Sequence, residues 1–184
     1  MKATAWLAGY ARATDPRVAA ANRLALIIAS SQPTYPLYLK YLVGGPWLAS
    51  WWTLLSTPLF LLVPWMARRD AALGGAQLVL AGLGNTVLTL KLFGPQAGLG
   101  WFLVPCALIG LCAFGRREWR WALGLVALCA LVALGQGRLG APLACFTPTE
   151  LAALWRMHFS GSIMLSIIVL TSFDCLPRWR RPAA

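Results

Sequence analysis

Charged residues are scarce in this chain. Only 11% of its 184 residues are Asp, Glu, Lys or Arg, whereas 59% are hydrophobic. Soluble domains are about one quarter charged and need a far more polar surface. The composition therefore excludes an ordinary soluble domain, and the lack of a glycine period or of sustained heptads excludes collagen-like and coiled-coil proteins. We expect lipid to be the main solvent of this protein.

Acidic residues and histidine are the rarest polar types. The chain has 5 Asp and Glu against 16 Lys and Arg, and His158 is its single histidine. No Ser-His-acid set and no glycine-rich phosphate loop can be assembled, so we expect no enzyme activity. The five cysteines form no Cys-x-x-Cys pair. We therefore predict no metal site, no cofactor and no disulfide framework.

Long apolar runs are abundant. A helix needs roughly 20 apolar residues to cross a bilayer, and lipid requires every backbone group to be paired within the helix. The predicted fold is therefore all-α, a polytopic bundle of six transmembrane helices between residues 22 and 173. The six stretches lie near residues 22–43, 47–66, 72–93, 98–115, 119–136 and 153–173.

Basic residues predict the orientation, because Lys and Arg are retained on the cytoplasmic side. Both termini are expected in the cytoplasm, residues 1–21 as an N-terminal segment and residues 174–184 as a basic tail. Four basic residues then fall on the outer side: Lys40, Lys91, Arg138 and Arg156. The inner basic residues are Lys2, Arg12, Arg17, Arg23, Arg68, Arg69, Arg116, Arg117, Arg120, Arg178, Arg180 and Arg181.

The same distribution indicates the partners and the location. The basic residues are divided among several short segments, which fits attraction to anionic lipids and does not fit nucleic-acid binding. We predict a multi-pass protein of a bacterial inner membrane, without a cleavable signal peptide. Trp6, Leu7 and Tyr10 leave open an amphipathic helix within residues 1–21.

Helix starts are marked by two capping patterns. Asp15 precedes Pro16, and Thr147 is followed by Pro148 and then Glu150, the pattern of a capping box. A helix, or a short segment leading into the sixth helix, is expected to begin there.

Four polar residues near the outer ends of helices form a first candidate site. Lys40 and Lys91 can extend to the headgroups, the ordinary role of lysine near a helix end. Alternatively, they join Arg156 and His158 in a cationic vestibule that receives an anionic headgroup or a small acid. For His158 the competing interpretation is a hydrogen-bonded packing role.

The first helix contains a second candidate site. Pro33 and Pro36 lack the backbone N–H groups that a helix needs, which predicts a kink and leaves two carbonyls without their usual donors. The polar side chains nearby can hydrogen-bond to the interrupted backbone; they are Ser30, Ser31, Gln32 and Thr34. The break either serves packing or forms the wall of a ligand pocket. Trp101 is an interfacial anchor or lines the same outward-facing pocket. Ligand-binding candidates are thus Gln32, Lys40, Lys91, Trp101, Arg156 and His158.

Four short motifs stand out at or near the predicted helices: Asn22–Leu26, Gly84–Leu88, Gly98–Pro105 and Phe114–Glu118. Together they resemble the six-helix membrane domains of bacterial class III adenylate cyclases and of some sensor histidine kinases. The resemblance implies a dimeric membrane anchor and receptor whose last helix leads to a catalytic domain. Here Pro177 follows the sixth stretch, so we expect the module to act alone or with a separate output partner.

Two functions remain open. The first is a receptor-like or anchoring module that binds a lipophilic or anionic ligand, in a cavity containing Gln32, Trp101 and His158. The second is an accessory or assembly subunit of a larger membrane complex, which associates through small-residue faces such as those around Gly82 or Ser162. A small transporter is a third possibility, although no inverted repeat is visible. Association as a homodimer or within a larger complex is expected.

Overall fold

The computed structural model describes residues 9–175, and within them every regular element is helical. The first half of the chain contains α2 (Pro16–Ser31), η1 (Gln32–Thr34), α3 (Tyr35–Leu42), η2 (Trp47–Ser56), α4 (Thr57–Leu61), α5 (Val63–Arg69) and α6 (Ala71–Phe93). The second half contains η3 (Pro95–Ala97), η4 (Leu99–Phe102), α7 (Leu103–Cys112), η5 (Arg116–Glu118), α8 (Trp119–Gly135), η6 (Gln136–Arg138) and α9 (Pro148–Ser172).

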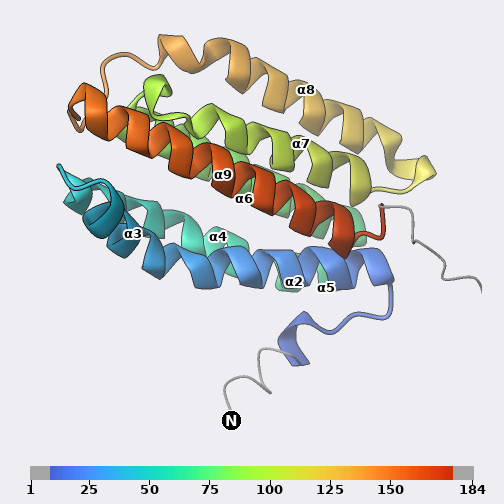
Figure 1. The fold of residues 1–184 in the computed structure, drawn as a ribbon. Coiled ribbons are helices and arrows are strands. Elements are labelled where there is room, and N and C mark those ends of the chain that lie inside the picture. Colours follow the sequence, from blue (N-terminus) through green and yellow to red (C-terminus); the bar gives the residue numbers. More distant parts are fainter. Residues whose placement is uncertain (1–8, 176–184) are drawn as a thin grey trace, which may run out of the picture.

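These elements join into six rods that run side by side (Figure 1). The start of α2, the turn between α7 and α8, and the end of α9 lie at one end of the bundle. The end of α3 and the connection from α8 to α9 lie at the other. The rods coincide with the six predicted stretches, apart from their first and last residues.

Four helices are long and apolar enough to cross a membrane, and the protein is a multi-pass membrane protein on this basis. They are Trp47–Arg69, Ala71–Phe93, Arg116–Arg138 and Pro148–Ser172. Leu99–Cys112 is apolar but shorter, and the first rod is interrupted by polar residues around Gln32. The all-helical prediction is confirmed, while four spans meet the length and composition requirements where six were predicted.

Helix starts differ from the predicted boundaries. The Asp15 carboxylate accepts hydrogen bonds from the backbone N–H groups of Arg17 (2.7 Å) and Val18 (3.4 Å), so α2 begins at Pro16 rather than near residue 22. The predicted capping box is present: Thr147 N–H donates to Glu150 Oε2 (2.8 Å), and Glu150 N–H donates to Thr147 Oγ1 (3.4 Å). Each cap therefore adds about five or six polar or weakly apolar residues before the hydrophobic run.

The predicted break in the first rod is a 3₁₀ turn. α2 ends at Ser31, and Gln32–Thr34 connects it to α3. The Ser30, Ser31 and Thr34 hydroxyls donate to the carbonyls of Ile27, Ile28 and Ser31. The Gln32 carbonyl, which the sequence leaves without its usual donor, accepts from Tyr35 N–H because the turn tightens.

The second rod begins with an unusually long 3₁₀ segment, Trp47–Ser56. Residues three apart are aligned in this geometry, and Ser50, Thr53 and Ser56 are aligned on its buried face. Each hydroxyl donates to the carbonyl three residues earlier. Ser56 Oγ also lies within hydrogen-bond distance of Asn85 Oδ1 of α6 (2.9 Å), so its single O–H is shared between Thr53 and Asn85 and a polar seam joins this rod to α6.

The helix α6 lies at the centre of the bundle and contacts all the other rods except the α9 rod extensively. Glycines permit the close approach. A Cβ at Gly74 would lie 2.8 Å from Ala67 Cα of α5, and one at Gly82 would lie 2.7 Å from Cys106 Sγ of α7. Small residues thus allow the close van der Waals packing that holds helices together in lipid, where the hydrophobic effect does not drive their association.

Candidate functional site

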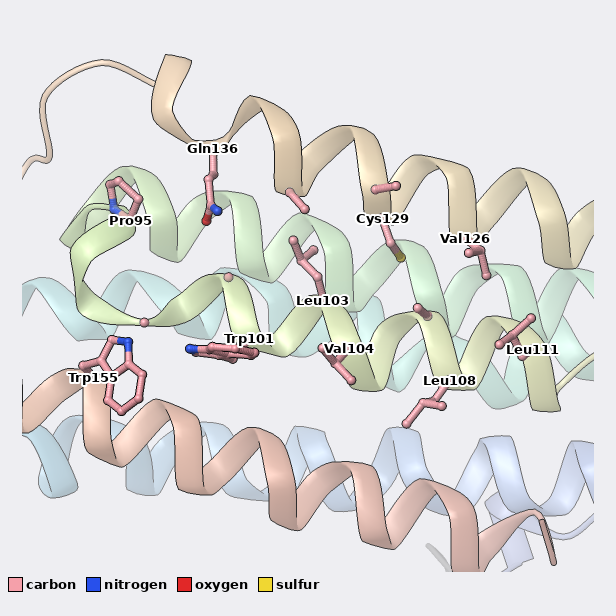
Figure 2. A pocket seen from close by; sticks show the side chains of 15 residues that line it. Pro95, Trp101, Leu103, Val104, Leu108, Leu111, Val126, Cys129, Gln136 and Trp155 are labelled. Atoms are coloured by element: carbon pink, nitrogen blue, oxygen red, sulfur yellow. The ribbon is translucent and has the colours of Figure 1, made fainter. Parts of the chain in front are cut away.

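A groove of about 590 Å³ runs between α7 and α8 and reaches the start of α9. Figure 2 shows Val126, Cys129 and Gln136 projecting from the α8 rod toward α7, with Leu103 facing them. Its wall on η4 and α7 extends from Trp101 to Leu111, about 15 Å at the helical rise of 1.5 Å per residue. The size falls within the usual range of small-molecule sites.

The polar groups of the groove gather at one end. Gln136, Trp101 and Trp155 line that end, and most of the remaining lining is aliphatic. None of these three side chains forms a hydrogen bond within residues 9–175. A Cβ at Gly100 would meet Gln136 Oε1 at 2.5 Å, so the glycine makes room for the amide. An amide and two indole N–H groups are therefore available to a polar group in the groove.

Aromatic contacts fix the indoles at this end. Trp155 stacks on Phe159, with ring centroids 5.0 Å apart, and the Trp101 ring meets the Phe159 ring edge-on at 5.1 Å. Ser162 Oγ of α9 donates to the Trp101 carbonyl at 2.7 Å. Packing along α9 thereby places Trp101 at this groove, which contains neither Gln32 nor His158 of the predicted pocket.

His158 is buried, with 2% of its surface exposed, and both ring nitrogens are hydrogen-bonded. Nδ1 lies 2.7 Å from the Ala97 carbonyl, and Nε2 lies 2.9 Å from the Tyr35 hydroxyl. A neutral ring that donates from Nδ1 and accepts at Nε2 satisfies all three groups. The histidine therefore ties α9 to α3 and to η3, which is the geometry of the packing interpretation.

The lysines of the expected vestibule are engaged elsewhere. Lys91 Nζ donates to the carbonyls of Leu139 (3.1 Å) and Ala141 (2.9 Å), in the connection between α8 and α9. Lys40 Nζ lies 5.2 Å from the centre of the Trp47 ring. Arg156 is exposed on α9.

The structure does not bring the six candidate residues together. Within residues 9–175, no hydrogen bond or cation–π contact joins Lys40, Lys91, Arg156 and His158 to one another. Gln32 is buried in the 3₁₀ turn with 7% of its surface exposed. Trp101 is the one of the six that lines the α7–α8 groove.

Sequence reasoning missed Gln136 and the polar seam of Ser50, Thr53 and Ser56. Gln136 is the last residue of the predicted fifth stretch, and a lone amide at the end of an otherwise apolar helix is a usable signal. The seam has a period of three, which a search at the α-helical period of 3.6 does not detect.

Metal-binding residues are not grouped in the described part of the chain. Among residues 9–175, no three His, Cys, Asp or Glu side chains lie close enough to hold a metal ion. The thiols of Cys112 and Cys175 do meet, with 3.1 Å between their sulfur atoms.

Comparison with known proteins gives no relative. No protein-family model, no curated protein and no solved structure matches this chain. The resemblance to cyclase and kinase membrane domains therefore stays a prediction.

Proposed function

We propose that this protein is a receptor-like, non-enzymatic module of a bacterial inner membrane that binds a lipophilic ligand in the α7–α8 groove. The observation that carries this proposal is the groove itself, with an aliphatic wall and unengaged polar groups at one end. The ligand is an amphiphile with a long apolar part and one polar end.

The lining supports this ligand class. Leu103, Val104, Leu108 and Val126 offer dispersion contacts to an alkyl or isoprenoid chain. At the polar end the indole N–H groups donate and the Gln136 amide both donates and accepts. These groups fit a carbonyl, hydroxyl or carboxyl headgroup. The groove is lined by no charged residue of the described chain, so neutral polar groups set its specificity.

Six crossings complete the proposed architecture. The first rod, Pro16–Leu42, is about 40 Å long at 1.5 Å per residue, which exceeds the hydrocarbon thickness of about 30 Å. Its polar break is hydrogen-bonded internally. The Leu99–Cys112 rod is shorter and requires local thinning of the bilayer. An even number of crossings would place both ends of the chain on one side.

The basic residues support cytoplasmic ends. Arg17, Arg68, Arg116 and Arg117 lie near the bundle end where α2 begins. Cys145 and Cys175 are exposed near opposite ends and provide a test. In intact cells with a permeable outer membrane, an impermeant maleimide should label Cys145 and not Cys175, with C145S and C175S as controls. Labelling of Cys175 alone would show that the protein has the opposite orientation in the membrane.

Ligand binding is tested on the full chain, extracted in mild detergent and weighed by native mass spectrometry. Ala130 lines the groove, whereas Leu131 on the same helix is 64% exposed and lies outside it. The wild type should retain a small lipophilic molecule. Ala130→Trp should lose it because the indole fills the groove, and Leu131→Trp should keep it.

The other outcomes discriminate between the proposals. A wild-type chain that carries no small molecule, or equal retention by both tryptophan variants, would overturn the groove proposal. A stoichiometric complex with another membrane protein would favour the accessory-subunit function. A homodimer with a retained ligand would agree with the receptor-like function.

A further inference from the structure

Residues 9–14 fold back against the outside of the bundle. The Tyr10 hydroxyl donates to the Leu61 carbonyl (2.9 Å), and the Arg68 guanidinium lies 4.9 Å from the centre of the Tyr10 ring. Arg68 Nη2 also donates to the Tyr10 carbonyl (3.2 Å). The buried Asn22 side chain donates from Nδ2 to the Ala11 carbonyl (3.2 Å). The segment is thus attached to both α2 and the α4–α5 rod.

A second groove, of about 650 Å³, lies between this segment and α2. Arg12 and Arg23 line it together with Leu26, Ile27 and Ser30. On α2, Arg23, Ile27 and Ser30 are spaced four and then three residues apart, so they share one face of the helix. Ser30 lies about 10 Å farther along the helix than Arg23. The groove is therefore basic toward the start of α2 and apolar along the helix.

Both arginines lack a counterion among residues 9–175, where neither guanidinium forms an ion pair or a hydrogen bond. The nearest carboxylate in the sequence, Asp15, accepts from the backbone at the start of α2. No acidic residue of the described chain lines the groove. Two guanidinium groups on one groove match the charge and geometry of a phosphate.

We infer that this groove binds one anionic phospholipid of the cytoplasmic leaflet. Its phosphate is held by Arg12 and Arg23, and an acyl chain runs along Leu26 and Ile27. The charge complementarity selects an anionic lipid, and the apolar half distinguishes a lipid from a free phosphate. The assignment of the leaflet depends on the orientation proposed above, whereas lipid binding itself does not.

The test is native mass spectrometry of the full chain in detergent, with added dioleoyl-phosphatidylglycerol or dioleoyl-phosphatidylcholine. The wild type should prefer phosphatidylglycerol. The double variant Arg12→Gln/Arg23→Gln should bind it about 10- to 30-fold more weakly. The matched control Arg116→Gln/Arg117→Gln removes the same charge at the same end of the bundle and should change binding less than about threefold.

A third variant tests the apolar half and keeps both arginines. Ile27 is 46% exposed, so Ile27→Trp should fold while its indole occupies the acyl-chain path. It should lower phosphatidylglycerol binding about tenfold. Size-exclusion chromatography and circular dichroism of each variant verify the fold, and a misfolded double variant leaves Ile27→Trp to decide.

Four results would overturn the inference. They are equal binding of the two lipids by the wild type, equal loss in both arginine double variants, full binding by Ile27→Trp, and displacement of the lipid by millimolar glycerol 3-phosphate. The Ala130→Trp variant should bind phosphatidylglycerol normally. Loss of its lipophilic ligand with retained phosphatidylglycerol therefore separates the two grooves, and failure of one proposal leaves the other testable.

Discussion

The helix α6 and the α8 rod look alike in the sequence and lie in different surroundings. The spans Ala71–Phe93 and Arg116–Arg138 each contain 23 residues and are nearly equally apolar. Yet 44% of the apolar 18-residue stretch within the first span is buried inside the protein, against 11% of the corresponding stretch in the second. Both spans contain glycine, but α6 also contains asparagine and threonine, which the α8 rod lacks. Gly74 and Gly82 of α6 lie against neighbouring helices, whereas a Cβ at Gly124 of α8 would meet nothing within 4 Å. In lipid, small and weakly polar residues mark the central helix because apolar residues gain nothing by leaving the bilayer.

The proximity of the ends of α7 and α9 can be tested by a disulfide bond, which either forms or does not form. The Cys112 and Cys175 sulfur atoms need to move together by only about 1 Å to reach bonding distance. Mild oxidation of the purified chain should produce one intramolecular disulfide. Mass spectrometry after digestion should find this link, and C112S or C175S should abolish it. A link to Cys129 of α8 instead would contradict the arrangement.

Loss of the His158 side chain should have the largest effect on stability. His158→Ala removes two hydrogen bonds and leaves a cavity, so we expect the free energy of unfolding to fall by about 2–4 kcal/mol. Tyr35→Phe should cost about 0.5–1.5 kcal/mol. Titration of the detergent-solubilised variants with SDS measures both. A double-mutant cycle should show a coupling near 0.6 kcal/mol, and strictly additive effects would place the two residues apart.

Glycine substitutions compare the two helices directly. Gly74→Ala in α6 should destabilise the protein by about 1–3 kcal/mol, because the new methyl group meets the Ala67 backbone. A Cβ at Gly124 in α8 meets nothing within 4 Å. Gly124→Ala should therefore be neutral or stabilise by up to about 1 kcal/mol. Equal losses in the same SDS titration would mean that α8 is packed as tightly as α6.

Leucines within α8 should show the smallest effects. Leu125 is 6% exposed and Leu131 is 64% exposed. We expect Leu125→Ala to lower the melting temperature in detergent by a few degrees, corresponding to about 1 kcal/mol of lost packing. Leu131→Ala should change it within error. A larger effect at Leu131 would reveal a protein contact on the outer face of α8, as an accessory subunit requires.

The positions of the six rods could be predicted well from the sequence, whereas the local helix geometry and the contacts within the rods could not. The capping patterns at Asp15 and Thr147 were recognisable because they are local, although the helices begin before the predicted boundaries. The 3₁₀ geometry of Trp47–Ser56 was missed, since it depends on buried hydroxyls and on Asn85 of another helix. Trp6, Leu7 and most of the basic tail lie outside the described residues.

The groove between α7 and α8 differs from the predicted pocket, because it contains Trp101 without Gln32 or His158. Its Gln136 lies at the end of the α8 rod, and no local sequence pattern pairs this residue with Gly100. Lys40, Lys91 and His158 were grouped because they share one end of the bundle. Their partners are a tryptophan ring, loop carbonyls and a tyrosine, which lie far away in the sequence or in separate elements.

Composition and the length of the apolar runs determined by themselves that the protein is helical and lies in a membrane, because the bilayer imposes the same requirement on every residue of a span. Which helix is central, which face is open and where the polar groups meet were decided only by the tertiary structure. Those properties depend on close contacts between helices, such as Gly74 with Ala67 and His158 with Tyr35, and apolar periodicity does not encode such pairings.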